Sequence, residues 1–304
     1  VLAKDVTLKY LASRTSGFSG ADLENLLNEA ALLAVRRNKS EITMSEIDEA
    51  HDRVLMGPAK KSRKVSEKDK KITAYHEAGH VVAGLKQENS NIVQKVTIIP
   101  RGMAGGYTNI QSEEEKMHTT RNELIETICT LLAGRVAEQL TFDDITTGAE
   151  NDIERATKIA RAMVCEYGMS ELGPVQLEQS ESSVFLGRDY NKTRNFSDKI
   201  AFEIDQQIRK IIDGCYAKTE TILKENKELL DLIAINLAKY ETLTKEQIEY
   251  LVENGHMKEE ECSNDNNYNE MSISELKSIA KDKEIKGYSK MNKEELINAI
   301  KEED

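Results

Sequence analysis

The stretch that decides the fold, residues 71–87, reads KITAYHEAGHVVAGLKQ. Its pattern predicts a helix, on which His76 and His80 stand four residues apart and therefore share one face. From there both imidazoles can reach a single metal ion, and Glu77 can reach a water molecule beside that ion without binding the metal. Two surface histidines on an ordinary helix are the alternative, which we disfavour because the chain has only five histidines.

An HExxH motif on a helix is typical of zinc-dependent hydrolases. A zinc ion lowers the pKa of bound water to roughly 7, so that a neighbouring carboxylate can take up its proton at neutral pH. The same carboxylate can then pass the proton to a departing amine. We therefore predict a zinc site with His76 and His80 as ligands and Glu77 as the catalytic general base.

A catalytic zinc also needs a third protein ligand and one open position. The metzincin pattern, which continues with Gly and then His, is excluded because Ala83 and Lys86 occupy those places. The third ligand is then a distant acidic residue, and spacing leaves several candidates: Glu113–Glu115, Glu138, Asp143, Asp144 and Asp152. Asp152 has a local advantage, because it falls in the first turn of a predicted helix that would fix the direction of its carboxylate. A second explanation fits equally well: an acidic residue in the first turn of a helix interacts favourably with the helix dipole, without binding a metal.

The composition narrows the class of protein. The 304-residue chain is 39% hydrophobic and 32% charged, with no Trp and three Pro, which predicts a soluble, helix-rich protein. Its net charge of −12 argues against nucleic-acid binding by the chain as a whole. Four widely separated cysteines without a CxxC pair disfavour both a disulfide framework and a cysteine zinc site. We find no signal peptide and no run of 18 apolar residues, so we expect no membrane span in the chain as given.

We predict a mainly α-helical chain with a small β-sheet, divided into three folded parts. In order, these parts and their connections are a helical part at 1–57, an exposed basic linker at 58–64, a catalytic part at 65–257, a disordered linker at 258–270 and a short helix–loop–helix module at 271–301. Ser19, and either Thr43 or Ser45, are expected to cap helices in the first part. In the catalytic part we expect helices over 71–87, 121–140, 149–167, 197–239 and 245–254, and strands over 93–99 and 107–110.

Several motifs follow one another along the chain: Gly17–Leu23 with Asn28–Ala31, His76–His80, Lys95–Gly102 and Thr147–Ile153. Together they resemble the FtsH family of ATP-dependent zinc metalloproteases, peptidase family M41, over roughly residues 1–257. The resemblance implies that Asp152 is the third zinc ligand beside His76 and His80, and that Glu77 is the general base. It also implies that residues 1–57 are the helical lid subdomain of an AAA ATPase and that 65–257 is the zinc-peptidase domain.

The resemblance also implies an activity, partners and a location. FtsH proteases degrade unfolded or damaged membrane and cytosolic proteins in quality control, and they assemble as homo-hexamers. No GxxxxGK[ST] phosphate loop occurs in this chain, so ATP is expected only through an ATPase core that the chain lacks. We therefore expect a zinc metalloendopeptidase, the C-terminal portion of a protein at the cytoplasmic face of the plasma membrane. The rival hypothesis is a non-catalytic, metal-stabilised module for oligomerisation or substrate docking.

Smaller features are interpreted from their surroundings. The strand at 93–99 resembles the family's edge strand, to which an extended substrate adds by main-chain hydrogen bonds; an ordinary core strand is the alternative. Glu138 is expected to pair with Arg135 in its own helix rather than to orient a zinc histidine. The module at 271–301 resembles short modules related to SAP and to the N-terminal piece of Rho. For it we favour the docking of an adaptor or substrate over nucleic-acid binding.

Overall fold

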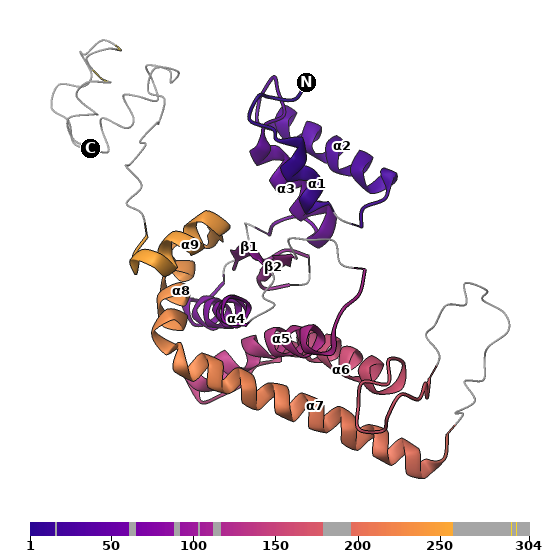
Figure 1. Cartoon of the computed structure of the whole chain (residues 1–304). Helices are drawn as coiled ribbons and strands as arrows, with labels where there is room; N and C mark the ends of the chain where they lie inside the picture. The colour runs from indigo at the N-terminus through magenta and orange to yellow at the C-terminus, as the bar shows by residue number, and fades with distance from the viewer. Residues whose placement is uncertain are drawn as a thin grey trace. The chain divides into compact units, whose positions relative to one another are not determined.

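A computed structural model describes residues 1–15, 17–60, 65–87, 92–102, 104–111, 117–178 and 196–257, together with Lys293 and Leu296. The chain divides into two compact units, 1–257 and 258–304. Apart from those two positions, the predicted linker 258–270 and the predicted module 271–301 lie outside the described residues. The described part of the first unit is mainly helical with one small antiparallel sheet, which confirms the predicted fold class (Figure 1). None of its helices combines the length and the hydropathy that spanning a bilayer requires.

Three helices form the N-terminal part, drawn in indigo and violet in Figure 1: α1 Leu8–Arg14, α2 Gly20–Arg36 and α3 Met44–Met56. As predicted, Ser19 caps α2, and a capping box with Asp22 satisfies two backbone N–H groups there. Thr43, rather than Ser45, is the N-cap of α3. The three helices enclose a small core of their own, made by Leu26, Ala30, Leu33, Ile47 and Ala50. α3 ends at Met56, and the φ of 86° at the following residue, Gly57, suits a residue without a Cβ.

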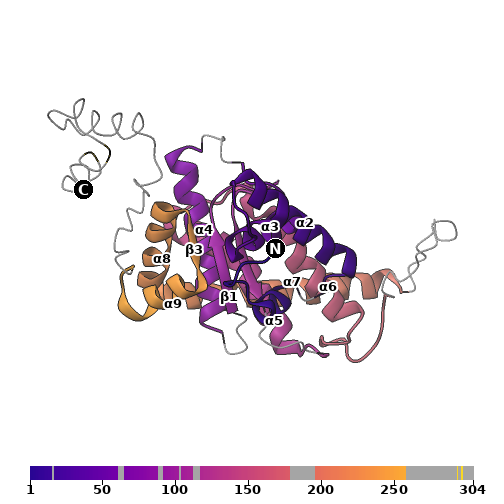
Figure 2. The same cartoon turned by 90° about the horizontal axis from the view of Figure 1, so that it is seen from above.

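One buried helix organises the remaining part of the unit. This helix and its two main neighbours are α4 Glu67–Leu85, α5 Arg121–Phe142 and α8 Lys227–Tyr240 (Figure 2). α4 is buried from Ala74 to Gly84, where His76, Glu77 and His80 are the charged or ionisable interruption of an otherwise largely apolar stretch. α4 and α5 approach closely at Gly79, where a Cβ would lie 2.5 Å from the carbonyl oxygen of Ala133. Only glycine permits this approach.

A second core joins α5 to two further helices. They are α6 Glu150–Cys165, which follows a 3₁₀ turn at Thr147–Ala149, and α7 Asp198–Glu225. The prediction of a single helix over 197–239 is wrong, because α7 ends before Asn226 and α8 begins after it. The Asn226 side chain donates a hydrogen bond to the carbonyl oxygen of Ile222 at 2.8 Å, which competes with continuation of the helix.

The sheet contains three antiparallel strands in the order β2-β1-β3: β1 Ile92–Thr97, β2 Tyr107–Gln111 and β3 Thr242–Thr244. The two predicted strands are confirmed as β1 and β2, which pair antiparallel with Thr97 opposite Tyr107. Thr97 also lies opposite Thr242 of β3, so both edges of β1 are paired. The hypothesis that β1 is a substrate-binding edge strand is therefore wrong, and in the described sheet the outer strands are β2 and β3. The predicted last helix is confirmed as α9, Lys245–Asn254.

Candidate metal centre

His76 and His80 lie one turn apart on α4 and present their rings to the same site, as the motif predicts. The rings meet edge to face with centroids 4.8 Å apart, and each residue is 8% exposed. Their Nε2 atoms lie 3.3 Å (His76) and 3.4 Å (His80) from Oδ2 of Asp152. Two imidazoles and one carboxylate thus offer three ligand atoms that all lie within 4.8 Å of one another.

Asp152 reaches the histidines because of the position at which α6 begins. The 3₁₀ turn Thr147–Ala149 leads directly into α6, so that Asp152 falls in the first turn, as predicted. Among the residues that the structure describes, His76, His80 and Asp152 form the group whose ligand atoms converge. The candidates Asp143 and Asp144 do not belong to this group. Glu113–Glu115 lie outside the described residues.

The Nδ1 atoms of both histidines are also engaged, and both partners come from α5. His80 Nδ1 donates to the backbone carbonyl oxygen of Thr130 at 2.7 Å, since a carbonyl oxygen can only accept. His76 Nδ1 lies 2.7 Å from Oε1 of Glu138, which is 1% exposed. Burial raises the pKa of Glu138, but hydrogen bonds from His76 and Thr146 outweigh burial and hold it below its usual value, so this carboxylate is an acceptor. With its proton on Nδ1 held in this way, each ring can offer its Nε2 lone pair to a cation bound between the histidines and Asp152.

The predicted pairing of Glu138 with Arg135 is wrong. Arg135 Nη2 donates instead to the carbonyl oxygen of Thr146 at 2.9 Å. The backbone N–H of Thr146 in turn donates to Oε2 of Glu138 at 2.8 Å. Glu138 therefore holds His76 with one carboxylate oxygen and the turn before α6 with the other, so that it supports ligands on two separate helices.

Gly134 is a further part of the centre that the motif analysis does not single out. A Cβ on Gly134 would lie 2.5 Å from both Cε1 and Nε2 of His76 and 2.7 Å from Nδ1. The imidazole therefore packs against the backbone of α5, closer than any residue with a Cβ would allow. The sequence carries one sign of this role. A glycine inside a helix lowers the stability of that helix by about 1 kcal/mol relative to alanine, so its presence there implies a reason in the packing.

Glu77 is buried beside the three convergent groups and is 5% exposed. Its Oε2 accepts a hydrogen bond from Thr108 Oγ1 of β2 at 2.6 Å. Its Oε1 rests on Gly106, where a Cβ would lie only 2.8 Å away. Burial raises the pKa of Glu77 above its usual value, which suits a group that takes up and releases a proton near neutral pH.

The charges of the centre shift one another's pKa values. Burial lowers the pKa of His76, yet hydrogen bonds with Asp152 and Glu138 outweigh burial and raise it to about 10. Burial raises the pKa of Asp152, but hydrogen bonds with His76 and His80 outweigh burial and lower it. The group thus attracts positive charge, and two imidazole nitrogens with one carboxylate oxygen are a donor set that suits zinc.

Comparison with known protein families places this centre in context. Residues 63–251, more than half of the chain, match the model of Peptidase family M41. The chain belongs to peptidase family M41. The M41 match spans the HExxH helix and Asp152, and it confirms the resemblance drawn from the motifs. Two shorter matches flank it: the AAA+ lid domain at residues 5–49, and the N-terminal domain of Rho termination factor at residues 267–304.

Curated relatives of this M41 chain carry the name ATP-dependent zinc metalloprotease FtsH. The relative from Bacillus subtilis (strain 168) is 53% identical over 277 residues, which cover 90% of this chain and 44% of the relative. The relative from Acholeplasma laidlawii (strain PG-8A) is 56% identical over 255 residues, 83% of this chain and 40% of the relative. The relative from Alkalihalophilus pseudofirmus is 57% identical over 258 residues, 84% of this chain and 38% of the relative. The chain thus spans about two-fifths of the length of these relatives.

Proposed function

We propose that this chain is a zinc-dependent endopeptidase in which His76, His80 and Asp152 hold the metal and Glu77 is the general base. The observation that carries the proposal is the convergence of two Nε2 atoms and one Oδ2 atom beside the buried carboxylate of Glu77. Membership of family M41 and the name shared by the FtsH relatives support the same conclusion.

Each residue of the centre has a distinct part in the proposed reaction. A zinc ion supplies Lewis acidity, which polarises a peptide carbonyl and lowers the pKa of water to about 7. Glu77 takes up the proton of the attacking water and delivers it to the leaving amine. Thr108 orients Glu77 by donating to one of its oxygens. Glu138 and the carbonyl group of Thr130 keep the two imidazoles in the tautomer that binds a cation.

The proposed substrate is an extended polypeptide. β2 is an outer strand of the described sheet, and its residue Thr108 contacts Glu77. A peptide that pairs with the free edge of β2 would therefore lie next to the general base. Main-chain pairing recognises the backbone more than the side chains, which suits unfolded or misfolded proteins of varied sequence.

Hydrolysis of an unstructured casein by the zinc-loaded chain tests this proposal. Glu77→Gln is expected to bind zinc normally and to hydrolyse casein about 100-fold more slowly or worse, because general base catalysis contributes at least that much. His76→Ala and Asp152→Ala are expected to lose zinc together with activity. Glu67→Gln, at the exposed start of the same helix, is the matched control and should keep both. Equal hydrolysis by Glu77→Gln and the unaltered chain would overturn the proposal.

The rival function, a non-catalytic metal-stabilised module for oligomerisation or docking, is less well supported. Such a module also binds zinc, but it has no use for a buried carboxylate held beside the ligands by Thr108 and Gly106. If the rival were correct, the zinc-loaded chain would leave casein intact, and removal of zinc would lower only the melting temperature.

For the whole protein we propose an ATP-driven protease of protein quality control. The name of the relatives, which includes ATP dependence, and the match to the AAA+ lid domain support this proposal. We further propose a homo-hexamer at the cytoplasmic face of the plasma membrane, with ATP bound only by an ATPase core. The proposed organisation has the lid at 1–57, a linker at 58–64, the peptidase domain at 65–257, a second linker at 258–270 and the tail module at 271–301.

For the tail module at 271–301 we propose docking of an adaptor or substrate, with nucleic-acid binding as the alternative. The match to the N-terminal domain of Rho termination factor covers this segment and keeps the alternative open to test. Titration of single-stranded RNA with the whole chain, and with a chain ending at Met257, distinguishes the two. Binding shown only by the whole chain, and weakening steeply as salt rises, would favour nucleic acid.

A further inference from the structure

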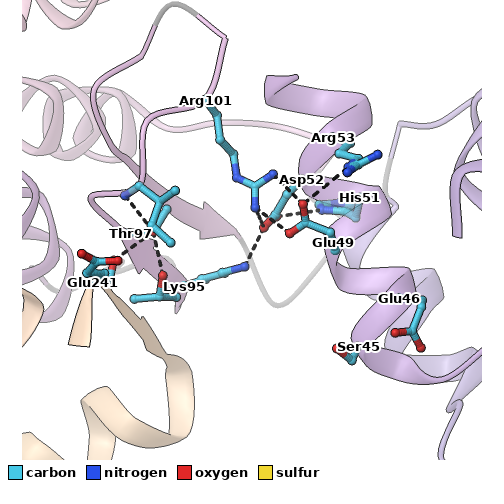
Figure 3. A network of polar contacts seen from close by, with 12 residues as sticks. Ser45, Glu46, Glu49, His51, Asp52, Arg53, Lys95, Thr97, Arg101 and Glu241 are labelled. Carbon is cyan, nitrogen blue, oxygen red and sulfur yellow. Dashed lines mark hydrogen bonds and ion pairs between the residues drawn. The ribbon is translucent and has the colours of Figure 1, made fainter. Parts of the chain in front are cut away.

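Helix α3 reaches the peptidase part through a buried cluster of charges, drawn in Figure 3. Asp52, 1% exposed, accepts a hydrogen bond from Lys95 Nζ of β1 at 2.6 Å, and its Oδ2 lies 3.5 Å from Nη2 of Arg101. Arg101 is 5% exposed and donates two hydrogen bonds to Glu49: from Nη1 to Oε1 at 3.2 Å and from Nη2 to Oε2 at 2.7 Å. The two carboxylates of α3 thus share Arg101, and Asp52 also pairs with Lys95 of β1.

Asp52 and Arg101 are almost wholly removed from water, so each depends on its partners for charge compensation. Burial raises the pKa of Asp52, but hydrogen bonding and the charge of Lys95 outweigh burial and hold this pKa well below its usual range. The carboxylate is therefore ionised. Loss of one partner would leave an uncompensated buried charge, which is costly. The cluster accordingly favours one position of α3 against the turn that follows β1.

The backbone next to Arg101 is also fitted to the end of α3. A Cβ on Gly102 would lie 2.5 Å from the carbonyl oxygen of Met56, the last residue of α3. Arg101 and Ala104 exchange two backbone hydrogen bonds, at 3.1 Å and 2.8 Å. The connection between β1 and β2 therefore begins with a tight turn that is pinned to α3 by side chain and backbone alike.

The same connection ends against Glu77. A Cβ on Gly106 would lie 2.7 Å from the carbonyl oxygen of Thr97 and 2.8 Å from Oε1 of Glu77. Gly106 is thus wedged between β1 and the Glu77 carboxylate. Thr108 then donates to the second oxygen of Glu77 at 2.6 Å. The described residues of this connection thus contact α3 at one end, through Arg101 and Gly102, and the Glu77 carboxylate at the other, through Gly106.

We infer that Asp52 is a positioning residue for the peptidase centre: through Lys95 and Arg101 it fixes the β1–β2 connection that orients Glu77. The inference rests on the proposed role of Glu77 as general base. Asp52 lies in α3, the last of the three helices that form the N-terminal part, whose residues 5–49 match the AAA+ lid domain. A movement of the N-terminal part would therefore change the position of the Glu77 carboxylate through contacts within a single chain.

The kinetic test compares Asp52→Asn with Asp48→Asn. Both residues lie on α3, one turn apart, but Asp48 makes its ion pair with Arg14 of α1, and the charge of Lys95 acts on it only through space. Asp52→Asn is expected to lower kcat on casein about tenfold, with KM and zinc content changed less than about twofold, at a temperature where the variant is folded. Asp48→Asn is expected to leave kcat unchanged. Lys95→Met should match Asp52→Asn, and the double variant should be no slower than the slower single variant, because the two residues act as one pair.

Hydrogen–deuterium exchange supplies a readout that does not depend on activity. In the zinc-loaded chain, backbone amides of residues 104–111 are expected to exchange about tenfold faster in Asp52→Asn than in Asp48→Asn. Equal exchange in the two variants would overturn the positioning of the connection. Faster exchange with unchanged kcat would overturn its link to Glu77. If instead Glu77→Gln retained full activity, the proposed function would fail, and that result is recognised independently of the exchange measurement.

Discussion

Replacing Gly134 by alanine tests the packing of His76 against α5. The added Cβ would lie 2.5 Å from Nε2 and Cε1 of the imidazole, which is far inside van der Waals contact. Because non-bonded carbon atoms prefer about 3.5 to 4.0 Å, the ring must withdraw by about 1 Å. Metal–ligand distances tolerate only about 0.2 Å, and Glu138 fixes the ring at Nδ1. We therefore expect the affinity for zinc to fall about 10- to 100-fold, the usual effect of disturbing the support of a metal ligand.

Competition for zinc between the protein and a chelator of known affinity measures this change. Gly214→Ala is the matched control, since Gly214 also lies inside a helix, α7, and a Cβ there meets no atom within 4 Å. The control should bind zinc normally and gain up to about 1 kcal/mol in the free energy of unfolding, because alanine favours helix over glycine. Equal zinc affinity of Gly134→Ala and the unaltered chain would refute the reasoning, since it would show that the ring can move together with its metal.

Three further perturbations examine the support of the site, the core and the lid. Glu138→Gln removes the charge that holds a ligand histidine, so the same competition assay should show about 10- to 100-fold weaker zinc binding, and unchanged binding would contradict this role. Ile233→Ala, fully buried in α8, should lower the free energy of unfolding in urea by about 2 to 5 kcal/mol. Ile235→Ala, 62% exposed on the same helix, should lower it by less than about 0.5 kcal/mol, and similar losses would contradict the core assignment. Burial raises the pKa of Glu46, but its hydrogen bonds outweigh burial and lower the pKa to about 2, so this carboxylate stabilises the fold above its unfolded-state pKa of about 4.5. The stability difference between the unaltered chain and Glu46→Gln should therefore shrink as pH falls from about 4.5 to about 2 in thermal unfolding, and a difference that stayed constant would exclude this account.

Features that depend on one or two helical turns could be predicted from the sequence. His76 and His80 share a face because they stand four residues apart on a helix. Ser19 and Asp22 form a capping box because they stand three residues apart at a helix start. The position of Asp152 in the first turn of its helix follows from local sequence in the same way. Such local geometry leaves few alternatives, whatever the rest of the chain does.

Features that join distant segments could not be predicted in this way. Glu138 meets His76 across 62 positions, whereas spacing within the helix pointed to Arg135. β3 has only three residues, too few for a periodic pattern, yet its pairing is what makes β1 a central strand. The contact of Asp52 with Lys95 spans 43 positions, so neither partner carries a local sign of the other.

The support of the two histidines has a consequence for the helices that carry it. The carbonyl group of Thr130, the Gly134 backbone and the Glu138 carboxylate are spaced by four along α5, and all three face the imidazole pair. If α5 slid along α4 by one turn, each imidazole would meet the wrong neighbour and both Nδ1 protons would lose their acceptors. The arrangement of the metal ligands therefore depends on how far α5 is shifted along α4. With cobalt(II) in place of zinc, the visible absorption of the ion would report that alignment, in a chain that contains no Trp to serve as a fluorescent reporter.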